Sequence, residues 1–159
     1  MSEITPLPDG YTYAELIEPY QDDATALIKH MPGTEWVGDY MELRQDWVEP
    51  YSADIHDVAV LAGKGALVGF GSLYVEKDRG LLADFVVDPK HRSRGIGKAI
   101  ILERMRIADN LGLRSVELTG IDDTNTLPTF YLQQGFRIQP NGLWIIGPDD
   151  RPGPFWREQ

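Results

Sequence analysis

The chain has 159 residues, of which 42% are hydrophobic and 25% are charged, a composition typical of one globular domain with a sizeable core. It contains no cysteine, which excludes a disulfide scaffold, a cysteine nucleophile and thiolate metal sites, and its net charge of −10 argues against nucleic acid as a general partner. We therefore expect a single cytoplasmic domain over residues 1–159, with no signal peptide, membrane helix or metal site.

Hydrophobic and turn patterns predict one strand and two helices in the first third of the chain. The proline-rich residues 1–10 predict a loose arm, and the alternating residues 11–17 predict a strand. A first helix is expected to begin at Asp22 or Asp23, as a cap, and to end near residue 31. A second helix, over about 34–47, places large side chains at helical spacing, which favours core packing over a ligand site: Trp36, Tyr40, Leu43 and Trp47.

The rest of the chain is predicted to be mainly strands around one long helix. Two strands are joined by a turn at residues 63–65, and Gly69 and Gly71 in the second strand indicate a bulge or the close approach of another group. Gly112 is expected to end the long helix in the left-handed conformation. The expected elements are strands at 57–62, 66–76, 82–87 and 114–119, helices at about 97–111 and 125–134, a hairpin at 136–146, and a Pro/Gly-rich tail at 147–159.

The stretch from Leu82 to Lys98 combines a buried strand, a basic glycine loop and a helix start. Pro89 ends the strand because it has no N–H for the ladder. Gly95 and Gly97 allow a ligand to approach the backbone where the first helical N–H groups lack intrahelical partners and the helix dipole favours anions. We expect a phosphate or pyrophosphate here; a helix start that attracts only counter-ions is the simpler alternative.

Motif spacing narrows the choice of phosphate carrier. A Walker A loop requires Ser or Thr after Gly-Lys, whereas Ala99 follows here, and a Rossmann fingerprint requires a third glycine where Ile100 stands. The pattern Arg92-x-x-Gly95-x-Gly97 instead resembles the acyl-CoA loop of the GNAT N-acetyltransferase superfamily.

A second motif lies downstream, where Tyr131 on an expected helix is followed by Gly135-Phe136 at a strand start. Each part alone is an everyday arrangement, a tyrosine near a helix end and a glycine cap. At this order and separation, however, it resembles the C-terminal signature of the same superfamily. The resemblance covers about residues 57–138.

The resemblance implies an α/β (α+β) fold, with a mixed, mainly antiparallel sheet of about six to seven strands flanked by about four helices. In that fold the central strand separates from the next strand, and acetyl-CoA occupies the gap. Phe85, Val86 and Val87 would offer peptide groups to the pantetheine, in the manner of an added strand. The pyrophosphate would lie on the loop residues, which are Arg92, Ser93, Arg94, Gly95, Ile96, Gly97 and Lys98. Asn125 would approach the CoA, or would only cap its helix.

The chemistry implied is direct attack of a neutral amine on the acetyl thioester. The N–H of Val86 or Val87 would stabilise the oxyanion, and Tyr131 would protonate the departing thiolate as general acid. Asp84 lies two residues before Val86, on the same strand face. The strand resembles the Glu-Asp-Phe/Leu strand of diamine-type acetyltransferases, with Ala83 in place of the first acid. Asp84 would hold the amine or accept its proton through water; alternatively it is structural, satisfied by the backbone or a nearby tyrosine.

The acceptor is suggested by the uneven distribution of charge. Residues 1–58, the acidic region, hold thirteen acidic residues and only two basic ones, whereas residues 89–114, the basic segment, hold seven basic residues and two acidic ones. In the fold that the resemblance implies, the first two helices and their link border the acceptor groove, and they belong to the acidic region. We therefore expect a cationic small-molecule amine or peptide; a merely solubilising face is the simpler explanation.

Other readings remain open at this stage. A non-catalytic acyl-CoA-binding sensor or partner module is the rival function, because the loop serves both, and the acyl group need not be acetyl. A homodimer formed through a strand end, or through Phe155 and Trp156 of the tail, is compatible with the sequence.

Overall fold

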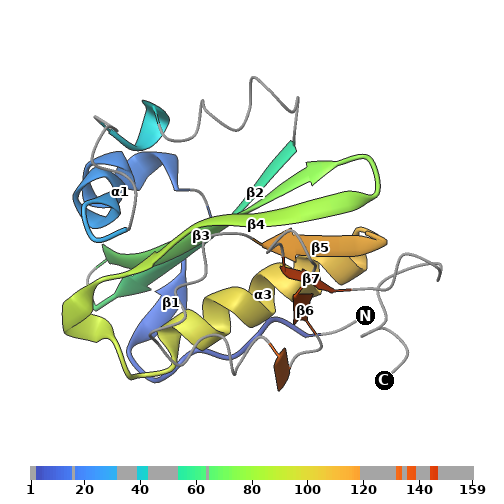
Figure 1. Cartoon of the computed structure of the whole chain (residues 1–159). Helices are drawn as coiled ribbons and strands as arrows, with labels where there is room; N and C mark the ends of the chain where they lie inside the picture. Colours follow the sequence, from blue (N-terminus) through green and yellow to red (C-terminus); the bar gives the residue numbers. More distant parts are fainter. Residues whose placement is uncertain are drawn as a thin grey trace.

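The structure is a computed structural model that describes residues 3–15, 17–31, 39–42, 54–63, 65–118, 132–133, 136–138 and 144–146. Two α-helices lie on opposite faces of one sheet, α1 above it and α3 below it in the view of Figure 1. The elements are β1 (Tyr11–Tyr13), the 3-10 helix η1 (Glu18–Tyr20), α1 (Gln21–Ile28), β2 (Asp54–Ala62), β3 (Ala66–Glu76), β4 (Arg79–Val87), the 3-10 helix η2 (Pro89–His91), α3 (Ile96–Asn110), β5 (Ser115–Leu118), β6 (Arg137–Ile138) and β7 (Trp144–Ile146).

Among the described residues, seven strands form one sheet in the order β1-β2-β3-β4-β5-β7-β6. Every neighbouring pair is antiparallel except β4 and β5, which are parallel. Short turns join β2 to β3 and β3 to β4, whereas a parallel pair needs a long crossover, and α3 supplies it. The mixed, mainly antiparallel α/β fold expected from the sequence is confirmed.

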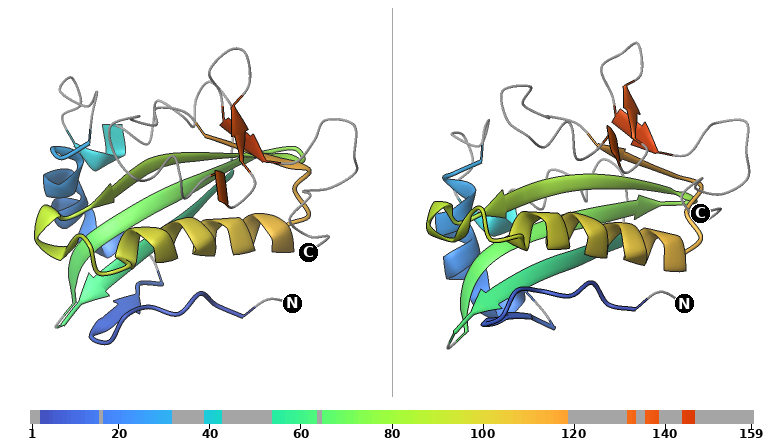
Figure 2. Two further views of the ribbon diagram at one scale, coloured as in Figure 1. Left: turned by 60° about the horizontal axis from the view of Figure 1, so that its bottom comes forward. Right: turned by 90° about the horizontal axis from the view of Figure 1, so that it is seen from below.

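Each face of the sheet has its own hydrophobic core. On the α1 face, Phe70 and Val86 pack with Leu27 and Ile28 of the helix. On the opposite face, Leu73 and Leu82 pack with Ile101 of α3, and further side chains pack around the start of that helix. Figure 2 shows α3 running along the sheet, with the N-terminal segment beside it. None of the helices in the described part of the chain is long and apolar enough to cross a membrane.

Two local expectations in the first third of the chain were wrong. The first strand ends at Tyr13, and Ile17 instead packs in the core of the α1 face. The residue before α1 is Tyr20, and no side chain caps the helix. Asp23 instead accepts a hydrogen bond from the N–H of Leu67 at 3.1 Å, so it ties α1 to β3.

The second predicted helix lies mostly outside the described residues. Residues 40–42 are helical, and Tyr40 is buried edge-on against Phe70, with ring centres 5.6 Å apart. This position agrees with core packing for Tyr40. The other large side chains at helical spacing lie outside the described part of the chain: Trp36, Leu43 and Trp47.

The N-terminal segment, for which we expected a loose arm, is attached to α3. The N–H of Thr5 donates to Glu103 Oε1 at 3.0 Å, and the hydroxyl of Tyr13 donates to the carbonyl of Thr5 at 2.9 Å. Burial, together with the charge of Glu103, raises the pKa of Tyr13 to about 12. Burial alone would raise the pKa of Glu103, but hydrogen bonds from Arg106 and Thr5 hold it below its usual value. The segment thus reaches the helix that begins at the glycine loop.

Candidate active site

A bulge in β4 shapes the centre of the site. Ser72 of β3 pairs with Ala83, and Phe70 pairs with Val86, so Gly71 alone stands opposite Asp84 and Phe85. Two residues facing one bend the strand and increase its twist. Asp84 has φ of 56°, a left-handed conformation that Asp and Asn tolerate better than most residues. The bulge or close approach expected at Gly69 and Gly71 is confirmed: the ladder between β2 and β3 shifts next to Gly69, and a Cβ at Gly71 would lie 2.8 Å from Arg104 Cζ.

Asp84 is buried and bonded to a tyrosine that the sequence analysis did not name. It is 9% exposed, and the hydroxyl of Tyr74 donates to its Oδ2. Tyr74 lies four residues after Phe70 on β3, so both side chains point to the α1 face. Asp84 therefore shares that face with Val86, as expected. Leu82, two residues before Asp84, packs on the α3 face, which shows that the bulge breaks the regular alternation of side chains.

The direction of the peptide groups separates Val87 from Val86. The N–H of Asp88 donates to the carbonyl of Val68 on β3 at 2.8 Å. Because peptide groups alternate in direction along a strand, those of Val86 also face β3, whereas those of Phe85 and Val87 face the opposite edge. Of the two N–H groups expected to serve the oxyanion, the one directed toward this edge is that of Val87.

That edge extends beyond the paired part of β5. The parallel ladder joins Arg79–Leu82 to Ser115–Leu118, and β4 continues for five residues after Leu82. The bulge and the peptide groups of Phe85 and Val87 lie in this extension. Residues 119–131, which follow β5, lie outside the described part of the chain, so the expected separation of the two strands stays a prediction.

The glycine loop turns the chain sharply into α3. Asp88 begins the turn, because its Oδ1 accepts the N–H of Lys90 at 2.9 Å. Ser93 has φ of 63° and Gly95 has φ of 91°, so two residues in the left-handed region precede the helix. The first helical bond runs from Ala99 N to Gly95 O, at 3.1 Å. In a helix that begins here, the first N–H groups point toward the loop.

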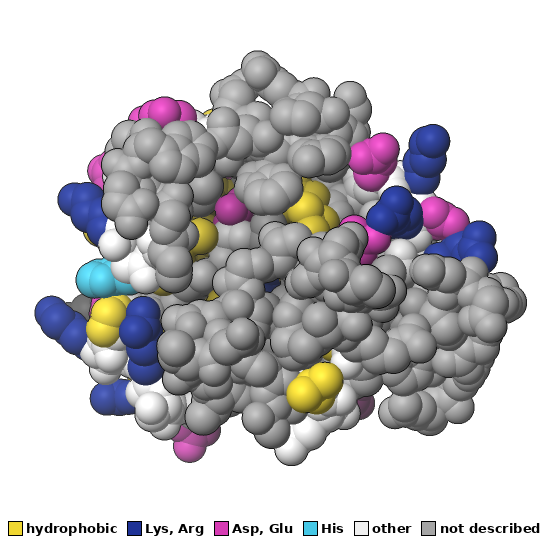
Figure 3. Space-filling model, in the orientation of Figure 1, with side chains coloured by type: hydrophobic (Ala, Val, Ile, Leu, Met, Phe, Trp, Pro, Cys, Tyr) yellow, Lys and Arg dark blue, Asp and Glu magenta, His cyan; other side chains and the backbone are white. Residues whose placement is uncertain are grey.

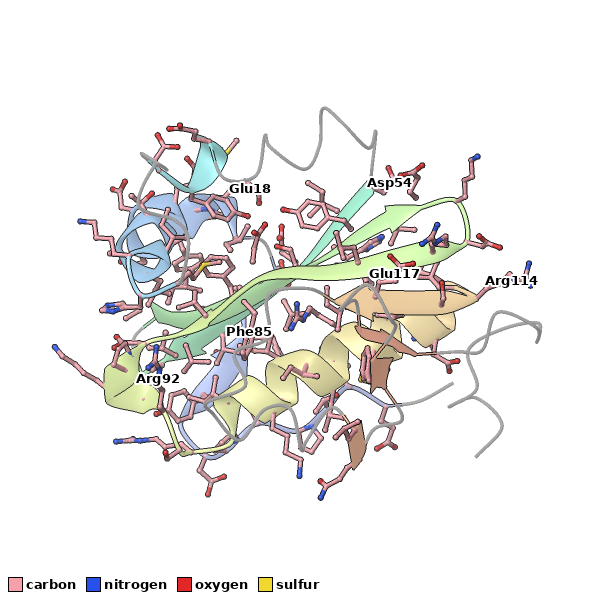
Figure 4. All side chains as sticks on the ribbon, viewed as in Figure 1. Glu18, Asp54, Phe85, Arg92, Arg114 and Glu117 are labelled. Carbon is pink, nitrogen blue, oxygen red and sulfur yellow. The ribbon has the colours of Figure 1, made fainter. Side chains whose placement is uncertain are left out.

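The basic side chains of the loop are attached to their surroundings. Arg92 Nε donates to the carbonyl of Val87 at 3.0 Å, so the loop holds the end of β4 (Figure 4). Arg94 Nη1 donates to the hydroxyl of Tyr11 at 3.2 Å, and that hydroxyl lies 2.8 Å from His91 Nδ1. The first strand therefore orients the loop, a contact that sequence reasoning did not anticipate.

Gly97 has a packing reason of its own. A Cβ at this position would come within 3.2 Å of Phe85 Cζ, so the aromatic ring of β4 rests on the first turn of α3. Figure 4 shows Phe85 between β4 and the helix. The ring of Phe85 therefore gives a packing reason for glycine at position 97, and the expected approach of a ligand to this glycine stays a prediction.

A second carboxylate lies on the same sheet face as Asp84. Asp57 is half-buried on β2, opposite Ser72, whose hydroxyl donates to Asp57 Oδ1 at 2.7 Å. Ser72 is two residues from Tyr74, so both hydrogen-bonded pairs occupy the α1 face. Asp57 lies opposite Ser72, and Ser72 lies opposite Ala83, the residue before Asp84; this pairing is long-range, so no local pattern in the sequence indicated it. Among the described residues, no group of three or more potential ligands could hold a metal ion.

Two predicted site residues, Tyr131 and Asn125, lie outside the described part of the chain, as does the tail with Phe155 and Trp156. The loop residues and Asp84 to Val87 are described, and the structure brings them together at one end of β4. In the face shown in Figure 3, basic side chains gather at the left near this loop, and acidic ones lie above them on the side of α1.

Comparison with known proteins agrees with this arrangement. The family model described as "Acetyltransferase (GNAT) family" matches residues 14–136, which is most of the chain. The chain belongs to the acetyltransferase (GNAT) family. It is therefore an acyltransferase enzyme of the acyl-CoA N-acyltransferase type. A comparison with curated proteins gave no match.

Solved structures share the fold at low sequence identity. A GNAT-family acetyltransferase from Staphylococcus aureus has a TM-score of 0.66 at 15% identity, covering 85% of this chain and 97% of its own. The ribosomal-protein-S18-alanine N-acetyltransferase of Escherichia coli has a TM-score of 0.65 at 14% identity, covering 89% and 98%. The PaiA N-acetyltransferase of Thermoplasma acidophilum, in complex with coenzyme A, has a TM-score of 0.57 at 17% identity, covering 85% and 96%.

Proposed function

We propose that this enzyme transfers an acetyl group from acetyl-CoA to a primary amine of a cationic small molecule or peptide. The observation that carries the proposal is the position of the end of β4, beyond its described ladder with β5, beside the start of α3. This region combines strand peptide groups, at Phe85 and Val87, with the N-terminal end of a fifteen-residue helix. Pantetheine has amides that suit the former, and a pyrophosphate suits the latter. The complex of the PaiA N-acetyltransferase with coenzyme A supports the same cofactor here.

The loop would hold the pyrophosphate through its backbone from Ser93 to Lys98. Arg92, Arg94 and Lys98 are exposed and bring positive charge to the same turn. Arg92 also donates a hydrogen bond to the carbonyl of Val87 and thereby fixes the end of β4. The N–H of Val87 points away from β3, toward the edge where the cofactor would lie. The cofactor and the acyl carbonyl would thus be held by one continuous piece of backbone.

Acyl transfer would proceed by direct attack of a neutral amine on the thioester carbonyl. The Val87 N–H would stabilise the negative charge that develops on the carbonyl oxygen. The amine nitrogen forms the new C–N bond, the C–S bond breaks, and the thiolate takes a proton from Tyr131. Asp84, oriented by Tyr74, would accept the proton that the amine loses, directly or through water.

The proposed cofactor site is tested by measuring the affinity for acetyl-CoA by calorimetry, at low and at high salt. Lys98→Glu places a negative charge in the first turn of α3, so we expect at least tenfold weaker binding. Lys29→Glu, an exposed position at the end of α1, makes the same change in net charge and serves as the matched control. Equal binding by the two variants and the wild type would contradict the site.

Turnover tests the reaction itself. Release of CoA from acetyl-CoA is measured with a panel of diamines, monoamines and basic peptides, for the wild type and Tyr131→Phe. Because Phe cannot donate a proton to the thiolate, we expect turnover by the variant to fall roughly 100-fold, while its affinity for acetyl-CoA is kept. Tight binding of acetyl-CoA without turnover of any amine would instead support an acyl-CoA-binding module.

A further inference from the structure

The guanidinium of Arg104 is buried under the bulge of β4. Arg104 lies in the middle of α3 and is only 1% exposed, although arginine is almost never fully buried without partners. Its Nη1 donates to the carbonyl of Ser72 at 3.1 Å, and its Cζ lies 5.2 Å from the ring centre of Phe85. Burying a guanidinium costs free energy, so contacts this specific point to a role beyond filling space.

Gly71 makes room for this side chain. A Cβ at position 71 would lie 2.8 Å from Arg104 Cζ and 2.9 Å from its Nε. Gly71 is also the residue that stands alone opposite the bulge, and Ser72, whose carbonyl accepts the bond from Arg104, follows it. The guanidinium therefore occupies the point at which the ladder between β3 and β4 slips by one residue.

A chain of contacts leads from Arg104 to the edge of β4. The guanidinium faces the ring of Phe85, and that ring in turn rests on Gly97 in the first turn of α3. Phe85 is the second residue of the bulge, and its backbone leads through Val86 to the Val87 N–H. A shift of the ring or of the bulge would move this N–H relative to the glycine loop.

We propose that Arg104 is a positioning residue for acyl transfer, which fixes Phe85 and the bulge so that the Val87 N–H is held in place for the oxyanion. This inference rests on the proposed function. Because Arg104 is buried, it acts through Phe85 and Ser72 and does not itself touch the substrates. Its loss should therefore lower kcat, which depends on transition-state geometry, while the affinity for acetyl-CoA depends mainly on the loop.

The test compares Arg104→Met with Arg106→Met, the same substitution two residues along the same helix, where Arg106 pairs with Glu103 at 2.6 Å. We expect Arg104→Met to lower kcat about 10- to 100-fold, as small misplacements at a reacting centre do, with the Kd of acetyl-CoA within threefold of the wild type. Arg104→Lys keeps a charge and a donor, so it should recover part of the lost turnover.

Gly71→Ala provides an independent perturbation, because the added methyl displaces the guanidinium without removing it. It should lower kcat in the same way, and together with Arg104→Lys it decides the matter if Arg104→Met does not fold. If Arg104→Met and Arg106→Met had equal kcat, the positioning role of Arg104 would be overturned, and the proposed function would stand. The inference would also be overturned if the variants lost kcat and acetyl-CoA affinity together, both in proportion to their loss of thermal stability. A wild type that neither binds nor turns over acetyl-CoA would overturn the proposed function and this inference together.

Discussion

At the scale of single residues, Asp84 is in an unfavourable environment on two counts. Its φ of 56° lies in the left-handed region, which costs an L-residue about 1 kcal/mol, and its carboxylate is buried. The hydrogen bond from Tyr74 compensates for part of this cost. Unfavourable conformations of this kind cluster at functional sites, where the surrounding structure holds them in place. The bond from Tyr74 agrees with the structural alternative for Asp84, and its chemical role stays a prediction.

Replacing Asp84 by Asn separates these two roles. Asn tolerates the same backbone conformation, can still accept the bond from Tyr74, and carries no buried charge, so we expect thermal stability to be kept or raised. An amide cannot take a proton from the amine, so we expect kcat to fall at least tenfold. The measurements are the thermal midpoint and steady-state turnover over a range of pH.

Asp78→Asn is the matched control, because Asp78 is an exposed carboxylate in the turn between β3 and β4, 3.8 Å from Arg114. It should change neither the stability nor the turnover appreciably. If Asp84→Asn keeps full activity, the carboxylate has no part in proton transfer and only its hydrogen bond to Tyr74 matters.

At the scale of elements, α3 is bounded by two glycines that share a conformation but not an environment. Gly95 precedes the helix with φ of 91°, and Gly112 follows it with φ of 77°. Alanine at either position is strained by about 1 kcal/mol, since its Cβ disfavours a positive φ. The two ends of one helix thus provide a matched pair of substitutions.

We expect Gly95→Ala and Gly112→Ala to lower the free energy of unfolding by similar amounts, about 1 kcal/mol each, in urea denaturation. Only Gly95→Ala should also weaken acetyl-CoA binding, because it would displace the amide groups that we propose to bind the pyrophosphate. Comparable loss of binding in both variants would show that helix stability, and not the geometry of the loop, controls the affinity.

The elements were largely predictable from sequence, whereas the arrangement that makes the site was not. Alternation, turn glycines and the Pro89 break identified β3, β4 and α3 closely, because each signal is local. The bulge depends on pairing between strands, which the local pattern does not specify. It breaks the regular alternation of β4, so Val86 packs on the α1 face and Leu82 packs on the α3 face. Asp23 resembled a helix cap, but its partner Leu67 is distant in sequence.

At the scale of the whole molecule, the basic segment contributes less exposed charge than its composition indicates. Arg104 is buried, and Arg106 is paired with Glu103. The remaining bases near the site lie around the glycine loop: Lys90, Arg92, Arg94 and Lys98. Exposed acidic side chains lie instead at η1, α1 and residues 39–42: Glu18, Asp22, Asp39 and Glu42. One end of the sheet therefore suits an anionic cofactor, and the α1 face suits a cationic acceptor.

Charge reversal on the α1 side tests whether the exposed acidic side chains there attract the amine substrate or only aid solubility. Glu18→Lys combined with Glu42→Lys leaves in place Asp39, whose Oδ1 accepts the N–H of Glu42 at 2.9 Å. If the acidic side chains steer a cationic amine, the KM for that amine should rise several-fold and depend less on salt. The KM for acetyl-CoA should stay unchanged, because its binding loop lies elsewhere.

The control moves the same amount of charge to a site remote from both substrates. Glu76→Lys combined with Asp78→Lys lies at the exposed turn between β3 and β4, at the opposite end of β4 from the glycine loop. A rise in the amine KM for the α1 pair alone supports local steering, since the two pairs change the net charge equally. An equal rise in the amine KM for both pairs would mean that only the total charge matters. If the amine KM rose for neither pair, the acidic side chains would be a solvated surface with no part in substrate binding.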